Sequence, residues 1–464
     1  MNARLCLAGA LAACLMPLGA AWADQAATPD IPPEHVAELV RQTLIPDPVM
    51  RQQFLMILRG RGDPDVVPGL IQVMQFVEDD GWIDRTLAGL TGEAEGKSWT
   101  EWMLWQQAHP EITAFEGFDA FKADVMAVLD PDFRLFLKPG IAHEIRLEEV
   151  AWGGVPKDGI PALTNPAHIA AAAATWLQDD ELVFGLEIAG DARAWPLRIL
   201  DWHEMLNDVV GGVPVTLAYC TLCGSGILYD ARVAGFEQPF VFGSSGFVWR
   251  SNKLMYDQTT HSLWHQFTGR PVIGPLTGSG IELKTLPVTI TSWQDWRARH
   301  PTTKVLSLET GYQRDYTPGE PYGDYFASAG LMFPALVADE RLAPKDYVFA
   351  LRADGHEQAW SLEDFEGGRV LNAEVGDLPV VLVGDAATRT VRAYESGGRA
   401  FAAGPEPTTL VADGQDWQIG EDALHSPDGA RLPRLPGHIA YWFAWQGFVD
   451  GAPLAEPAEN SRRD

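Results

Sequence analysis

The sequence predicts an α+β protein in which a helical N-terminal domain precedes a β-rich, internally duplicated domain. Three observations carry this prediction. Apolar residues recur at helical spacing over residues 34–137, short β-type runs separated by Gly, Pro and Asp begin at residue 183, and those runs repeat further along the chain. A chain of 464 residues that is 46% hydrophobic can bury more than one core.

Residues 1–23 are predicted to be a cleaved export signal. Arg4 supplies a positive start, residues 5–18 are apolar, and Ala21-Trp22-Ala23 fits a small-x-small cleavage site. Cys14 ends a stretch that resembles a lipoprotein cleavage box, but that signal would be very short, so we favour cleavage after Ala23. We therefore expect a periplasmic or secreted protein, and we find no other segment that is long and apolar enough to be a transmembrane helix.

The chain is strongly acidic, with a formal net charge of −29. Removal of residues 1–23 takes away Arg4 and no acid, which leaves −30. Such a surface repels phosphate backbones, so nucleic acid is excluded as a partner, and solubility is the simplest explanation of the charge.

Within the helical domain, residues 54–70 resemble one helical hairpin of the HEAT type, with Asp63 before the second helix. Trp99, Trp102 and Trp105 stand three apart and form one stripe of a helix. Buried aromatic side chains dominate cores, so we interpret this stripe as core packing. The alternative is a docking face through which this domain binds a protein partner.

Residues 138–182 form a connector rich in Gly, Pro and Ala, after which two repeat units follow at 183–310 and 345–450. A shift of 165 residues superimposes Val183-Phe184-x-Leu186 on Val348-Phe349-x-Leu351, Ala194-Trp195-x-Leu197 on Ala359-Trp360-x-Leu362, and Pro214-Val215-x-Leu217 on Pro379-Val380-x-Leu382. Later the shift becomes 149, and Trp293-x-x-Trp296 meets Trp442-x-x-Trp445. In each unit we expect two strands, a helix or turn, and another strand, with the helix over 198–210 in the first unit.

After loss of the leader, Cys220 and Cys223 are the only cysteines, so they form either one local bridge or one site. The second unit lacks them. At the shift of 165, Cys220, Cys223, His203 and Glu204 correspond to Asp385, Thr388, Gly368 and Arg369. The shared fold therefore does not need these residues, and we interpret the first unit as active and the second as degenerate.

One hypothesis for the cysteine pair is a metal site. Two thiolates in a C-x-x-C turn are a ready pair of soft ligands, and His203 is the best candidate for a third. Copper or zinc would suit such a set. His261 and His265 are further candidate ligands, four residues apart.

The alternatives are a periplasmic dithiol/disulfide oxidoreductase and a static disulfide. A C-x-x-C pair can cycle between dithiol and disulfide, although here glycines and a β-type run follow it instead of an activating helix. A bridge across so short a loop would add little stability. A further, non-enzymatic hypothesis is an envelope scaffold that binds its partner through the helical domain.

Several short motifs occur in the order typical of one family. They are Trp152-Gly153-Gly154, Asp158-Gly159-Ile160-Pro161, His203-Glu204-x-x-Asn207-Asp208, Tyr219-Cys220-x-Leu222-Cys223-Gly224, Met255-Tyr256-Asp257 and Ser262-Leu263-Trp264. Over about residues 145–448 the chain resembles the bacterial domain-of-unknown-function family numbered 3179. The resemblance implies the same cysteine pair and an envelope or secreted protein, and it implies no activity. Thr221 departs from the family pattern, which has Pro at this position.

Overall fold

The computed structural model describes residues 31–77, 81–449 and 451–456, and these form two compact units. The first contains the chain up to Val128 together with Leu137–Gly140, and the second contains Leu129–Phe136 and the chain from Ile141 onward. The predicted export signal, with Cys6 and Cys14, lies outside the described residues. In the part of the chain that is described, no helix has the length and apolar character needed to cross a membrane.

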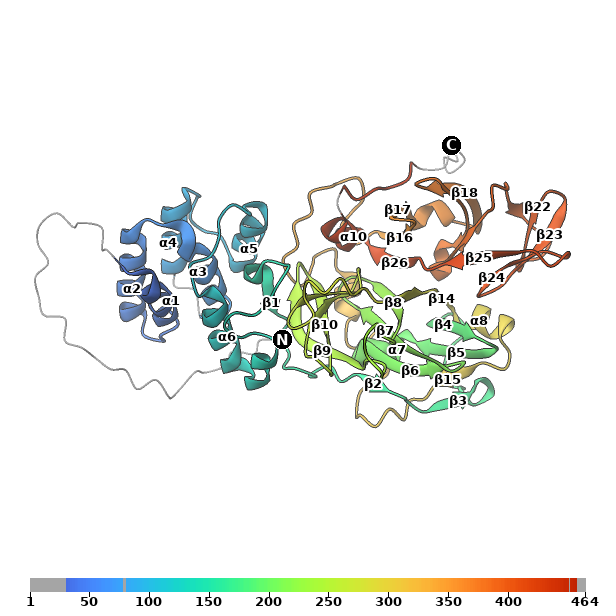
Figure 1. Ribbon diagram of the computed structural model, residues 1–464, viewed down its shortest axis with the longest axis horizontal. Coiled ribbons are helices and arrows are strands. Elements are labelled where there is room, and N and C mark those ends of the chain that lie inside the picture. The colour runs from blue at the N-terminus through green and yellow to red at the C-terminus, as the bar shows by residue number, and fades with distance from the viewer. Residues whose placement is uncertain (1–30, 78–80, 450, 457–464) are drawn as a thin grey trace, which may run out of the picture. The chain divides into compact units, whose positions relative to one another are not determined.

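The first unit is helical, as predicted (Figure 1). Asp47 caps one of its helices through its carboxylate, and Ser98 with Glu101 forms a capping box on another. Trp102 is fully buried and donates to the Asp84 carboxylate at 2.8 Å, so this part of the tryptophan stripe lies in the core. The helices are α1 (Pro33–Gln42), α2 (Pro48–Arg61), α3 (Val67–Met74), α4 (Trp82–Thr91), α5 (Trp99–Ala108) and α6 (Phe118–Leu129).

The second unit is β-rich, and its first copy contains three five-stranded sheets. Their orders are β1-β9-β10-β11-β12, β13-β8-β7-β6-β2 and β14-β4-β5-β15-β3. The strands are β1 (Val150–Trp152), β2 (Leu163–Thr164), β3 (His168–Ala170), β4 (Leu182–Ile188), β5 (Asp191–Pro196), β6 (Met205–Val210), β7 (Val213–Cys220), β8 (Ser225–Asp230), β9 (Phe242–Trp249), β10 (Asn252–Asp257), β11 (Leu263–His265), β12 (Arg270–Ile273), β13 (Thr285–Leu286), β14 (Thr289–Ser292) and β15 (Lys304–Leu306). Two helices, α7 (Leu197–His203) and α8 (Trp293–Arg299), belong to this copy.

The second copy, orange to red in Figure 1, has a three-stranded sheet of order β17-β16-β26 and an eight-stranded sheet of order β18-β19-β20-β25-β24-β23-β22-β21. The short helix α9 (Gly323–Ala327) precedes it. Its elements are β16 (Tyr347–Ala353), β17 (His356–Ser361), β18 (Arg369–Val375), β19 (Leu378–Asp385), β20 (Thr390–Glu395), β21 (Ala402–Ala403), β22 (Thr409–Ala412), β23 (Gln415–Ile419), β24 (Ala423–His425), β25 (Arg431–Leu435), β26 (His438–Tyr441) and α10 (Trp442–Phe448).

The predicted duplication is visible in the strand register. In the first copy Phe184 pairs with Trp195, and in the second Phe349 pairs with Trp360, 165 residues later in each strand. The register of β6 with β7 repeats in β18 with β19, and that of β7 with β8 repeats in β19 with β20. The later shift of 149 also holds, since β14 pairs with β4 as β26 pairs with β16. The fold class predicted from the sequence is therefore confirmed.

The two copies share one hydrophobic core. Phe184, Trp195 and Leu217 of the first copy and Phe349 of the second belong to the same cluster of buried side chains. Strand β26 lies beside β8, and β14 lies beside β20, so each copy places its late strand against the other copy. The packing of the two copies against each other is therefore reciprocal.

One local prediction was wrong. The helix expected over residues 198–210 ends at His203, because Glu204 adopts a left-handed conformation with φ 54° and closes the helix. Strand β6 starts at Met205 and pairs with β7 along its whole length. The β-branched Val209 and Val210 near its end suit a strand, and the tertiary pairing overrides the helical spacing of the apolar residues.

Candidate thiol site

A tight turn between β7 and β8 brings the two cysteines together. Cys220 ends β7 and pairs with Ser225, the first residue of β8. The turn is closed by a hydrogen bond from the Cys223 amide to the Cys220 carbonyl at 3.2 Å, and Gly224 supplies a left-handed residue with φ 58°. The two sulfur atoms lie 2.7 Å apart, and the side chains are 1% and 0% exposed. Both cysteines are free thiols.

The second copy builds the same turn without cysteine. Asp385 pairs with Thr390, as Cys220 pairs with Ser225, and Arg389 occupies the position of Gly224 with φ 53°. The turn conformation therefore belongs to the repeated fold. The thiols are an addition to the first copy.

Cys223 is the more enclosed of the two thiols. Its Sγ lies 3.2 Å from Oδ1 of Asn252 and 3.6 Å from the carbonyl oxygen of Ser251, both buried. Burial raises the pKa of the Cys223 thiol well above its usual range, and the neighbouring Cys220 raises it further. Cys223 is therefore a protonated donor at neutral pH.

A buried ion pair supports the turn from the other side. Lys253 on β10 donates to the Glu204 carboxylate at 2.8 Å, and these residues are 5% and 6% exposed. The same carboxylate accepts from the Thr221 hydroxyl at 3.1 Å and from the Tyr322 hydroxyl at 3.2 Å. With three donors, a buried charge of this kind is well satisfied. This network links α7, the cysteine turn and β10.

A small cavity of about 50 Å³ adjoins the turn. Glu204, Lys253 and Tyr322 give it a polar side, and Cys220 lines it, whereas Cys223 does not. Phe247 and Phe333 contribute apolar surface. One thiol therefore faces a space that a small molecule can enter, and the other is held behind it.

His203 has hydrogen-bond partners other than the thiols. Its Nδ1 lies 2.7 Å from the Pro161 carbonyl oxygen, which can only accept, so Nδ1 carries the proton. Its Nε2 lies 2.6 Å from the Tyr316 hydroxyl. Burial lowers the pKa of His203 to about 4, so the ring is neutral. The structure thus brings Cys220 and Cys223 together and leaves the third predicted ligand committed to a backbone carbonyl and a tyrosine.

The other two candidate ligands, His265 and His261, also contact residues other than the cysteines. His265 is buried, its Nδ1 lies 3.2 Å from the Thr268 amide nitrogen, and burial lowers its pKa to about 3. His261 stacks against Tyr256. Over the residues that the structure describes, there is no group of three or more His, Cys, Asp and Glu side chains that could hold a metal ion.

Sequence reasoning missed Lys253 and Tyr322 as parts of the site. Lys253 lies within a β-type run, where a single Lys is normally a solvent-facing residue. Tyr322 belongs to the segment between the copies, for which the sequence indicated no element. Glu204 stood out in the sequence as a residue that the second copy lacks, and nothing there indicated its lysine and tyrosine partners.

Fold and site together define a class: a two-copy β-rich protein with one buried vicinal dithiol. The family model for the protein of unknown function DUF3179 matches residues 157–452, which is more than half of the chain, and the protein belongs to this family. Comparison with curated proteins and with solved structures returned no match.

Proposed function

We propose that the protein is a thiol–disulfide redox protein in which Cys220 and Cys223 are oxidised together to an intramolecular disulfide. The observation that supports this proposal is that the two sulfur atoms lie 2.7 Å apart, while Cys220 lines the cavity and Cys223 does not. A metal site is less well supported by this spacing. With zinc–sulfur bonds of about 2.3 Å, two thiolates of a tetrahedral site lie about 3.8 Å apart.

The size of the cavity favours a small oxidant over a protein disulfide. A volume of about 50 Å³ compares with about 30 Å³ for one water in the liquid, so the space suits a molecule of the size of hydrogen peroxide. Both thiols are buried, which keeps bulky disulfides from reaching a sulfur atom.

The reaction has two steps. The Cys220 thiolate attacks one peroxide oxygen, the O–O bond breaks, and the departing hydroxide leaves as water with the proton lost by the thiol. The Cys223 sulfur then attacks the Cys220 sulfenic acid, an S–S bond forms, the S–O bond breaks, and a second water leaves. Two thiols lose two electrons and the peroxide gains them. A small external dithiol then exchanges with the bridge and is itself oxidised to a disulfide, which returns the pair to the reduced state.

The raised pKa of Cys223 suits the first step, because a protonated thiol behind the reacting sulfur does not compete for the oxidant. In the second step Cys223 loses this proton, which leaves with the sulfenic acid oxygen as part of the water. The proposal also fits the predicted export signal. Outside the cytoplasm a dithiol meets an oxidising environment, in which it can be converted to a disulfide.

The test uses the full chain with Cys6→Ser and Cys14→Ser, so that Cys220 and Cys223 are the only thiols. One equivalent of hydrogen peroxide should remove two titratable thiols and lower the mass by about 2 Da, and dithiothreitol should restore both. In Cys223→Ser, Cys220 should give a sulfenic acid that dimedone traps. In Cys220→Ser, the remaining thiol should not react.

Thr388→Ser at the matching turn of the second copy is the control and should react as the parent does. Two unchanged thiols after peroxide treatment would refute the proposal, provided that the urea-unfolded protein is oxidised under the same conditions. Copper or zinc that copurifies at one ion per chain and is lost in Cys220→Ser would instead support the metal hypothesis.

A further inference from the structure

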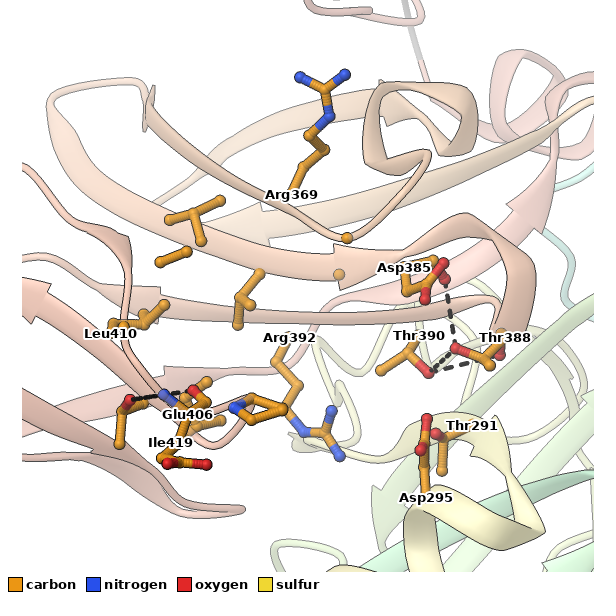
Figure 2. Close-up of a pocket in the computed structure, with 18 of the residues that line it drawn as sticks. Thr291, Asp295, Arg369, Asp385, Thr388, Thr390, Arg392, Glu406, Leu410 and Ile419 are labelled. Atoms are coloured by element: carbon orange, nitrogen blue, oxygen red, sulfur yellow. Dashed lines mark hydrogen bonds between the residues drawn. The ribbon is translucent and has the colours of Figure 1, made fainter. Parts of the chain in front are cut away.

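The second copy has a larger pocket at the position that corresponds to the thiol site. Its volume is about 480 Å³, within the range of small-molecule sites (Figure 2). Asp385 and Thr388 line it, and these are the counterparts of Cys220 and Cys223 at the shift of 165. Arg369, the counterpart of Glu204, also lines it. The copy that lacks the thiols therefore has a different cavity in the same place.

The helix that borders this pocket differs in its side chains from its counterpart in the other copy. Asp295 and Arg299 of α8 line it. At the shift of 149 their counterparts on α10 are Ala444 and Phe448. Phe448 packs against the aromatic rings of the first copy, with ring centroids 5.4 Å from Trp249, 4.6 Å from His265 and 5.1 Å from Phe267. The equivalent helix positions are therefore apolar and packed against aromatic rings in α10, whereas in α8 they are charged and line the pocket.

Two arginines, Arg392 and Arg299, line the pocket, and an ion-pair network holds Arg392 from behind. Arg392 is 4% exposed and donates through Nε and Nη2 to the buried Glu421 carboxylate at 3.0 and 2.7 Å. Arg434 donates to the same carboxylate from its other side. One acid is thus shared between two buried cations. Arg299 adds a third cation, and burial together with the charge of Arg392 lowers its pKa.

The free edge of Arg392 faces the pocket. Both of its bonds to Glu421 use Nε and Nη2, and within the described chain Nη1 has no hydrogen-bond partner. Its guanidinium points across the pocket toward Asp295 (Figure 2). A buried cation with an unused donor aimed into a cavity suits an anionic group of a ligand.

The remaining polar groups limit the charge of that ligand. Carboxylates of Asp295, Asp385 and Glu406 line the same pocket, so a phosphate dianion or a polyanion would meet repulsion. The hydroxyls of Thr388 and Thr390 lie 2.8 Å apart beside Asp385 (Figure 2). Carboxylates and hydroxyls in this arrangement accept from, and donate to, ligand hydroxyl groups.

We infer that this pocket binds a small hydroxylated monocarboxylate of the sugar-acid type. Arg392 and Arg299 would hold its carboxylate, while Asp385, Thr388 and Thr390 would bind its hydroxyls. The apolar side chains of Leu410 and Ile419 would lie against the carbon skeleton. The inference does not depend on the redox proposal, because no atom of the thiol site takes part.

The test is isothermal titration of the full chain with D-glucuronate as the probe, and with D-glucose and acetate as partial probes. We expect saturable 1:1 binding of glucuronate and at least about tenfold weaker binding of both partial probes, since each lacks one of the two groups recognised. Arg299→Gln should weaken glucuronate binding about tenfold or more, and Thr388→Val should weaken it severalfold.

Arg297→Gln is the matched control on the same helix, because its guanidinium pairs with Asp179 at the surface, and it should bind as the parent does. Cys220→Ser should also bind normally. The inference is overturned if glucuronate does not bind saturably, if glucose binds equally well, or if neither Arg299→Gln nor Thr388→Val changes the affinity in folded protein.

Discussion

The two copies of the β-rich unit agree in what they use to hold the backbone and differ in what they present to ligands. Asn207 illustrates the agreement: its side chain donates to the Phe242 carbonyl at 2.9 Å and accepts from the Phe242 amide at 3.0 Å. Its counterpart Asn372 makes the same pair of bonds to Phe401, both at 2.8 Å. Paired bonds to a neighbouring backbone are a scaffold function, and both copies keep them.

The difference lies at the turn after β7 and β19. In the first copy it holds two enclosed thiols beside a small cavity, and in the second it holds Asp385 and Thr388 beside a tenfold larger one. A duplicated fold can therefore change the chemistry of one turn without changing its register, because side chains at a turn make few of the contacts that fix the strands.

The largest effect is expected from moving the thiols to the second copy. Asp385→Cys with Thr388→Cys, in a chain with Cys220→Ser and Cys223→Ser, should give a pair that reacts with an aromatic disulfide reagent more than about tenfold faster than the native pair. Asp385 and Thr388 are half-buried, whereas the native cysteines are enclosed, and access controls the rate. Equal rates, measured by release of the chromophore, would show that burial does not set the reactivity of this turn.

A second large effect concerns the ion pair that only the first copy has. Lys253→Met should lower the free energy of unfolding by about 3 kcal/mol, because it leaves the Glu204 carboxylate buried without its cation. Adding Glu204→Gln should recover much of this loss. Urea denaturation measures both, and Arg270→Met, which breaks the exposed pair with Glu282, should cost less than about 1 kcal/mol. A loss for Lys253→Met no larger than for Arg270→Met would count against a structural role of the buried pair.

Substitutions of Asn207 and Asn372 test whether the two copies hold their backbones in the same way. Asn207→Ala should cost about 2 kcal/mol, because this residue is 5% exposed and also accepts from the Thr216 hydroxyl at 2.9 Å. Asn372 is exposed, so Asn372→Ala should cost about 1 kcal/mol or less. Thermal or urea unfolding would decide. If only one substitution lowers stability, the two residues are not equivalent.

The last expected effect is a pH dependence that arises from Asp201, a buried carboxyl of the first copy. Burial raises the pKa of Asp201 to about 7, compared with about 3.9 in an unfolded chain. Because the folded state holds this proton more tightly, stability falls as the pH rises from about 4 to 7.

Asp201→Asn should therefore stabilise the protein at pH 7.5 and have a smaller effect at pH 4.5, where the Asp201 carboxyl of the folded protein is already protonated. Neutral His203, with its pKa lowered to about 4, contributes the opposite slope in both proteins, so the difference between them isolates Asp201. The counterpart Glu366 is exposed, and Glu366→Gln should be neutral at both pH values. The same shift in Glu366→Gln would contradict the assignment.

Much of the architecture could be predicted, because the internal repeat can be recognised in the sequence alone. Apolar pairs such as Phe184 with Trp195 recur in order at a constant shift, and a constant shift preserves the register of strand pairing. The helical domain was equally accessible through its spacing and caps. The strand from Met205 was not, since its apolar residues also fit a helix and the choice depends on pairing with β7.

By itself the sequence determined the family, the fold class, the duplication and the cysteine pair, because each of these depends on the order and spacing of residues along the chain. The tertiary structure decided the partners. It bonds His203 to a backbone carbonyl and a tyrosine, and it brings Lys253 and Tyr322 to Glu204. It also forms a pocket lined by arginines and by Asp385 and Thr388, the counterparts of the thiols. Contacts between residues a hundred positions apart depend on how strands and helices pack, and no local pattern records that packing.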